Sequence, residues 1–90
     1  MKVDLFTSSI DLQDIVLSGY PGEIFEEQVN VDNSDVYNGC LYCFYDLEYK
    51  ELAEFLKKYK KYGYEIRDSS SGNFIEVHEP YSSRFGFSLN

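Results

Sequence analysis

The chain has little of what disulfide scaffolds, zinc sites and common enzyme motifs require. Its 90 residues include two cysteines and one histidine, too few for a disulfide framework or a typical structural zinc site. No apolar run reaches the roughly 18 residues that a membrane helix needs, and the N-terminus lacks the features of a signal peptide. Glycine-rich phosphate loops and the Gly-x-Ser-x-Gly nucleophile motif are absent from the sequence. We therefore expect a cytoplasmic protein with no catalytic residues, no metal and no cofactor.

Positive charge is also scarce. Eight basic residues stand against sixteen acidic residues, which gives a net charge of −8. Residues 1–45 hold eight acids and one base, residues 46–63 hold four acids and five bases, and residues 64–90 hold four acids and two bases. A phosphate backbone would be repelled by most of this molecule, so direct nucleic-acid binding is not expected. An acidic surface favours encounter with a basic protein partner.

The clearest structural pattern is a long amphipathic helix over residues 46–63. Its apolar side chains recur at helical spacing and form one stripe: Leu52, Phe55, Leu56, Tyr59 and Tyr62. Asp46 is expected to cap the N-terminus, and Gly63 can adopt the positive φ that ends a helix. The lysines near the C-terminal end complement the negative end of the helix dipole.

Alternating side chains predict the strands of a single domain that spans residues 1–90. The predicted segments are 2–7, 23–31, 40–45, 64–68 and 74–78, with a last edge strand near 85–89. Segment 40–45 is apolar on both faces and should be an inner strand. Residues 10–18 fit either a short N-terminal helix or a strand. The prediction is an α+β fold, in which a small antiparallel or mixed sheet of four to six strands packs against the long helix.

The cysteines form the motif Cys40-Leu41-Tyr42-Cys43 shortly before the predicted helix. This motif resembles the active-site dithiol of the glutaredoxin and thioredoxin group, and over these four residues the resemblance implies a thiol-redox role for Cys40 and Cys43. If the segment is a strand, however, cysteines three positions apart point to opposite faces and cannot pair. His78 beside Glu79 is a candidate general base, but a lone histidine at a strand end is more often a surface residue.

The carboxylates of the first half are the third candidate site. Besides Asp11 and Asp14, they include a group that we expect to bind a partner: Glu23, Glu26, Glu27, Asp32 and Asp35. The plainer interpretation is a solvated face that keeps a small protein soluble. The functional interpretation is a surface that imitates the phosphates of DNA. Nine tyrosines and seven phenylalanines exceed what the apolar stripes need, and Tyr20 and Tyr37, in or beside turns, would suit such an interface.

The leading hypothesis is a non-enzymatic inhibitor that binds a basic partner, either as a monomer or as a homodimer. In size and charge the chain resembles the small phage-encoded inhibitors of restriction and CRISPR nucleases. That likeness implies occlusion of a nucleic-acid-binding groove, in the cytoplasm of a host cell. The alternatives are a thiol-redox protein that uses Cys40 and Cys43, and an immunity-type or structural binding module.

Overall fold

The computed structural model describes the backbone of residues 1–31 and 39–79, and the side chains of residues 1–26 and 41–79. Several predictions concern residues outside these ranges: the acidic loop with Asp32 and Asp35, the docking residue Tyr37, and the edge strand at 85–89. Neither helix in the described part is long and apolar enough to cross a membrane.

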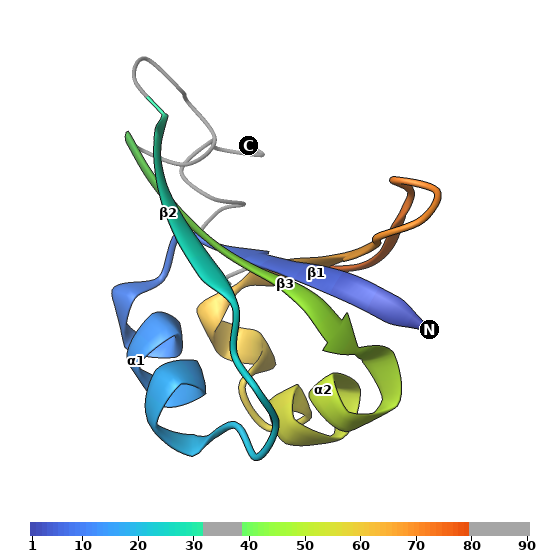
Figure 1. The fold of residues 1–90 in the computed structure, drawn as a ribbon. Helices are drawn as coiled ribbons and strands as arrows, with labels where there is room; N and C mark the ends of the chain where they lie inside the picture. The colour runs from blue at the N-terminus through green and yellow to red at the C-terminus, as the bar shows by residue number, and fades with distance from the viewer. Residues whose placement is uncertain (32–38, 80–90) are drawn as a thin grey trace.

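The described chain is an α+β fold in which both helices cover one face of an antiparallel sheet (Figure 1). The elements in chain order are β1 (Lys2–Thr7), α1 (Ile10–Gly19), β2 (Glu26–Val31), β3 (Gly39–Glu48), α2 (Tyr49–Leu56), the 3₁₀ helix η1 (Lys60–Tyr62), β4 (Tyr64–Asp68) and β5 (Phe74–His78). The five strands have the order β2-β3-β1-β4-β5, and every neighbouring pair is antiparallel. The predicted inner strand at 40–45 is confirmed, because β3 lies between β2 and β1.

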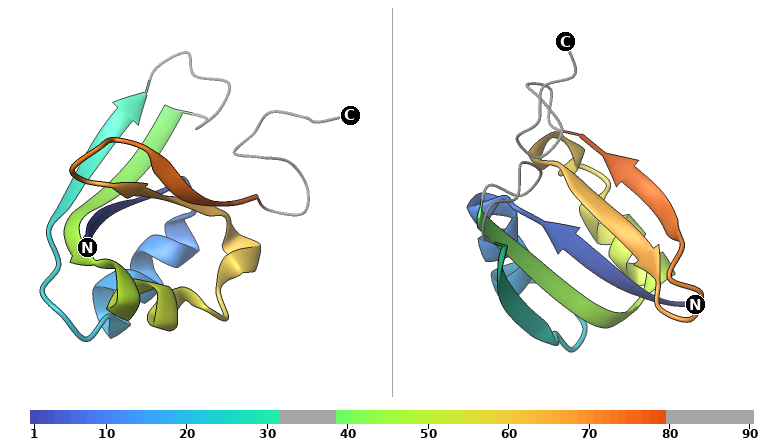
Figure 2. Two further views of the ribbon diagram at one scale, coloured as in Figure 1. Left: turned by 90° about the vertical axis from the view of Figure 1, so that its right-hand side faces the viewer. Right: turned by 90° about the horizontal axis from the view of Figure 1, so that it is seen from above.

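The two views in Figure 2 show the helices against one side of the sheet, and the hydrophobic core consists of side chains from both layers. Val3 and Leu5 of the central strand are fully buried, and so are Phe44 of β3 and Ile66 of β4. The helices contribute fully buried side chains from one face each: Leu12 and Val16 from α1, and Leu52 and Leu56 from α2. At about 1.5–3 kcal/mol for each large apolar side chain, this shared layer is the main source of stability.

Residues 10–18 form most of α1. The sequence had fitted either a helix or a strand for this segment. The helix begins after Ser9, whose hydroxyl oxygen accepts a hydrogen bond from the backbone N–H of Leu12 at 3.1 Å. That bond satisfies one of the N–H groups that have no partner in a first helical turn. Ser9 is therefore the N-cap of α1.

The prediction of one long helix over 46–63 is wrong. Helix α2 covers only Tyr49–Leu56, and after a turn at 57–59 the chain forms η1. The apolar stripe nevertheless packs as predicted, because Phe55, Tyr59 and Tyr62 all lie against the core. Three-residue spacing brings the rings of Tyr59 and Tyr62 to 6.3 Å, which suits the three residues per turn of a 3₁₀ helix. Gly63 does end this segment, with φ of 84°.

Asp46 is not a helix cap but part of a β-bulge in β3. Val3 pairs with Leu47 and Leu5 pairs with Phe44, so two residues of β3, Tyr45 and Asp46, lie opposite Asp4 alone. Asp46 has φ of 63°, in the left-handed region that aspartate tolerates better than most residues. The extra residue restores Leu47 to the core side, where it is 2% exposed.

Asp4 is buried, and it holds the bulge in place. Its carboxylate accepts hydrogen bonds from the Asp46 backbone N–H at 3.3 Å, the Ser69 hydroxyl at 2.7 Å and the Arg67 guanidinium at 2.8 Å. Arg67 also stacks over the ring of Phe6, 4.7 Å from its centroid. Burial alone would raise the pKa of Asp4, but the hydrogen bonds and the charge of Arg67 outweigh it, so the pKa lies below its usual value of 3.8.

Replacing Asp4 with asparagine (Asp4→Asn) should lower the free energy of unfolding at neutral pH by about 2 kcal/mol, because the charge-assisted bonds to Arg67 and Ser69 are weakened. Since the folded-state pKa of Asp4 is lowered, its contribution is complete above pH 3.8 and is lost as the pH falls through the folded-state value. Urea unfolding at neutral and acidic pH measures both effects. Asp14→Asn, at an exposed position of α1, is the control, and equal stability of the two variants at neutral pH would contradict the assignment.

Candidate functional site

The structure places two exposed aromatic rings beside two exposed carboxylates where β2 begins. Phe25 and Tyr45 are 39% and 41% exposed, and their rings stack with centroids 6.0 Å apart. The backbone N–H of Tyr45 donates to the Phe25 carbonyl at 2.9 Å, which holds the two residues side by side. Glu23 and Glu26 are exposed on either side of Phe25 in the chain. We call these four residues, Glu23, Phe25, Glu26 and Tyr45, the acidic-aromatic edge.

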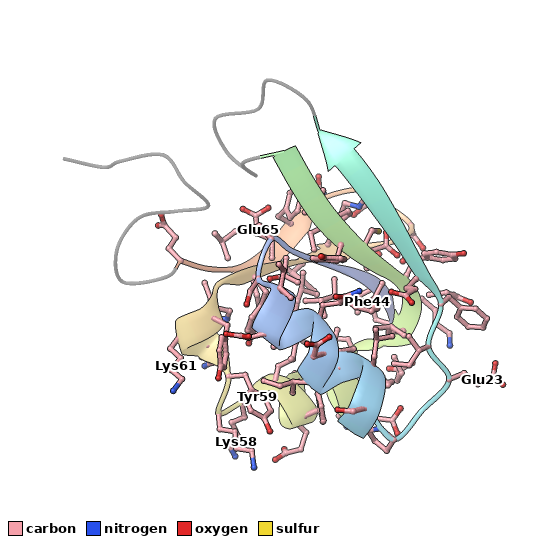
Figure 3. All side chains as sticks on the ribbon, turned by 90° about the vertical axis from the view of Figure 1, so that its left-hand side faces the viewer. Glu23, Phe44, Lys58, Tyr59, Lys61 and Glu65 are labelled. Carbon is pink, nitrogen blue, oxygen red and sulfur yellow. The ribbon has the colours of Figure 1, made fainter. Side chains whose placement is uncertain are left out.

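Further acids lie next to this edge on α1. Asp11 and Asp14 are exposed and are three positions apart, so they share a face of the helix, and Gln13 contacts the Glu26 carboxylate at 3.5 Å. No ion pair within the described residues involves Asp11, Asp14, Glu23 or Glu26. Figure 3 shows Glu23 on one side of the molecule and Lys58 and Lys61 on the other. The described acids of the first half are therefore not neutralised by the lysines after α2.

Two tyrosines, Tyr20 and Tyr42, are core residues, and Tyr20 is one of the two that were expected at an interface. Tyr20 is 9% exposed, its ring packs edge-on against Phe55 at 5.5 Å, and its hydroxyl donates to Glu51 at 3.0 Å. Burial, followed by the bond to Glu51, raises the pKa of Tyr20 above its ordinary value. Tyr42 is 6% exposed. The expectation that Tyr20 offers its ring to a partner is wrong, because α2 covers it.

The structure describes the side chains of only some of the other residues that were predicted to bind a partner. Glu23 and Glu26 are exposed as expected. Glu27 pairs through its backbone with Cys43, and its side chain lies outside the described part, as do Asp32, Asp35 and Tyr37. Phe25 and Tyr45 were not predicted to bind a partner, although both lie within the predicted strand segments 23–31 and 40–45. Alternation with the buried Tyr42 and Phe44 would have placed Tyr45 on the outer face of the strand. No comparable pattern marks Phe25, which precedes β2.

The Cys-x-x-Cys motif lies within β3 and not at a helix N-terminus. Pairing between β2 and β3 runs without a shift from Gly39 to Phe44, so positions 40 and 43 fall on opposite faces of one strand. This is the strand arrangement that argues against a dithiol. Among the described residues, no cluster of three or more His, Cys, Asp or Glu side chains could hold a metal ion.

A second polar cluster joins β5 to the start of α2, and the sequence did not predict it. Glu76 accepts hydrogen bonds from the Tyr49 hydroxyl and from His78 Nε2, the latter at 2.7 Å. The imidazole of His78 also lies against the ring of Tyr64, with centroids 4.8 Å apart. In the sequence, the acid next to His78 is Glu79. In a strand, however, residues two apart share a face, and this brings His78 to Glu76.

The Tyr49–Glu76–His78 cluster is held in a defined charge state. Burial acts to raise the pKa of Glu76, but the bonds from Tyr49 and His78 and the charges of His78 and Lys60 outweigh it, so the pKa is lowered. The same bond, followed by burial, raises the pKa of Tyr49. At neutral pH the cluster is therefore a fixed carboxylate with a phenol donor. It can orient a ligand or brace β5 against α2.

Removing the Tyr49 hydroxyl (Tyr49→Phe) should raise the pKa of Glu76, because the carboxylate loses one of its two donors. Carbon-13 NMR titration of the Glu76 carboxyl measures this directly. A lowered pKa stabilises the fold above pH 4.5, the ordinary value for glutamate, so the variant should lose less stability than the wild type on acidification. Tyr45→Phe is the control, and an unchanged Glu76 titration in Tyr49→Phe would show that the bond is not made in solution.

Comparison with known proteins found no relative of this chain. No protein-family model matches the chain, no curated protein matches it, and no solved structure matches its fold. The function must therefore be argued from the two surfaces above, the acidic-aromatic edge and the Tyr49–Glu76–His78 cluster.

Proposed function

We propose that this protein is a non-enzymatic interaction module that binds a basic protein through the acidic-aromatic edge. The partner that we favour is a nucleic-acid-binding enzyme, such as a restriction or CRISPR nuclease, whose basic groove the module would occlude. Glu27, Asp32, Asp35 and Tyr37 follow Glu26 closely in the sequence, and we include them in the proposed binding surface.

The observation that carries this proposal is the stacked pair of exposed rings, beside which Glu23 and Glu26 form no ion pair with any described residue. Exposed aromatic side chains supply apolar contact area with little conformational entropy to lose, and interfaces concentrate binding energy in such residues. Tyr45 is anchored by its backbone bond to Phe25, so the pair is ordered before a partner arrives. Preorganisation of this kind reduces the cost of binding.

Charge supplies the selectivity in this proposal. The aromatic pair alone would contribute little binding energy in a basic groove that normally holds DNA. Such a groove does, however, attract a protein with a net charge of −8. The carboxylates of Glu23 and Glu26 would take the place of phosphates, and the lysines after α2 would lie away from the groove (Figure 3). The complex should therefore form quickly at low salt and weaken as salt rises.

Charge reversal at the edge tests this directly. The double variant Glu23→Lys/Glu26→Lys should weaken binding to a susceptible nuclease by about tenfold or more, because two attractive contacts become repulsive. The measurement is inhibition of DNA cleavage by a panel of purified restriction and CRISPR nucleases, together with Kd as a function of salt for any nuclease that is inhibited.

The matched control is Glu54→Lys/Glu79→Lys, which makes the same change in net charge at exposed positions outside the edge. It should lose much less affinity than the edge variant. Equal losses from both double variants would mean that only overall charge matters. Failure to inhibit or bind any nuclease of the panel at low salt would reject the proposed partner.

A further inference from the structure

A groove of about 350 Å³ lies on the other functional surface, between α2, η1 and β5. The ring of Tyr49 and the methyl group of Ala53 supply its apolar wall, and Glu76 contributes from β5. Its volume is at the lower end of the range in which proteins hold small ligands. None of the residues of the acidic-aromatic edge lines it.

The groove is a basic site on an acidic protein. Lys50, Lys57 and Lys60 line it, against two glutamates. Lys57 pairs with Glu54 at 3.7 Å, but both side chains are more than 70% exposed, so this pair is weak. No ion pair among the described residues involves Lys50 or Lys60.

The position of Lys50 is not explained by the stability of the helix. It lies in the first turn of α2, where a positive charge is unfavourable beside the positive end of the helix dipole. Lys60 comes from η1, after the helix has ended, yet both lysines line the same groove. By contrast, Lys58 and Lys61 lie over the rings of their neighbours Tyr59 and Tyr62, at 5.5 Å and 5.4 Å, and do not line it.

The two glutamates offset part of this positive charge, and three lysines against two glutamates leave the lining with one positive charge in excess. Glu76 already accepts bonds from Tyr49 and His78, which hold its carboxylate in one orientation. Glu54 is exposed and faces Lys57. An anion that enters the groove therefore meets Lys50 and Lys60, of which Lys60 also interacts electrostatically with Glu76. Beside them lies the ring of Tyr49, whose hydroxyl donates to Glu76.

We infer that this groove binds a small organic anion, a phosphate or carboxylate group attached to a planar body. The anionic group would be held by Lys50 and Lys60, and the planar body would lie on the ring of Tyr49, where Ala53 leaves space. The inference does not depend on the proposed inhibitory function, because the two sites share no residue. The same chemistry could be supplied by a nucleotide or by an aromatic acid.

The test is a titration of nitrogen-15-labelled protein, followed by chemical shifts of the backbone amides. Adenosine monophosphate and benzoate are the anionic probes, and adenosine and benzamide are their neutral counterparts. At least one anion should cause saturable shifts in the millimolar range, confined to α2, η1 and β5, and its neutral counterpart should bind about tenfold more weakly. The probe that saturates distinguishes a nucleotide from an aromatic acid as the source.

Matched lysine variants separate a site from general attraction. Lys50→Gln/Lys60→Gln should weaken binding about tenfold, since charged hydrogen bonds to the anion are lost, whereas Lys58→Gln/Lys61→Gln should leave it nearly unchanged. Ala53→Leu should also block binding, by filling the groove, with the other amide shifts preserved. The inference is overturned if neither anion saturates, if the neutral probes bind equally well, or if both lysine pairs have the same effect.

Discussion

The hydrogen bonds of one buried carboxylate set the geometry of both candidate surfaces. Asp4 lies in the central strand and ties three segments together: the bulge of β3, the side chain of Arg67 on β4, and Ser69 in the turn that follows. A buried carboxylate is tolerated only when its charge is compensated, and here four donors from these segments do so. The register of β3 against β1 therefore depends on Asp4.

That register determines which side chains of β3 are exposed and which are buried near the bulge. Within the bulge, Tyr45 is exposed and its ring stacks on Phe25 in the acidic-aromatic edge. After it, Leu47 returns to the core and the chain enters α2 at Tyr49, whose hydroxyl meets Glu76 of β5. A strand without the extra residue would reverse the faces of all later positions, because side chains alternate with a period of two. The extra residue of the bulge thus lies in the chain between Tyr45 of the acidic-aromatic edge and Tyr49 of the basic groove.

The sequence predicted the fold class well and the details near the bulge poorly. The strands at 2–7, 64–68 and 74–78 and the stripe from Leu52 to Tyr62 follow from side-chain periodicity, which reports burial directly. Asp46 and the length of α2 were wrong because local propensity favours a cap and a continuous helix there. Tertiary contacts prevailed: the backbone of Asp46 donates to Asp4, and Tyr59 and Tyr62 reach the core through a 3₁₀ turn.

The amino-acid sequence by itself determined the composition of the surfaces: a strongly acidic first half, a lysine cluster after the main helix, and more aromatic rings than a small core needs. Only the tertiary structure decided which of those groups meet. It buried Tyr20 against Phe55, exposed Tyr45 beside Phe25, and paired His78 with Glu76 while Tyr49 approached from α2. The physical reason is that charge and composition are properties of single residues, whereas a site depends on strand register and helix ends, which are fixed by contacts between residues far apart in the chain.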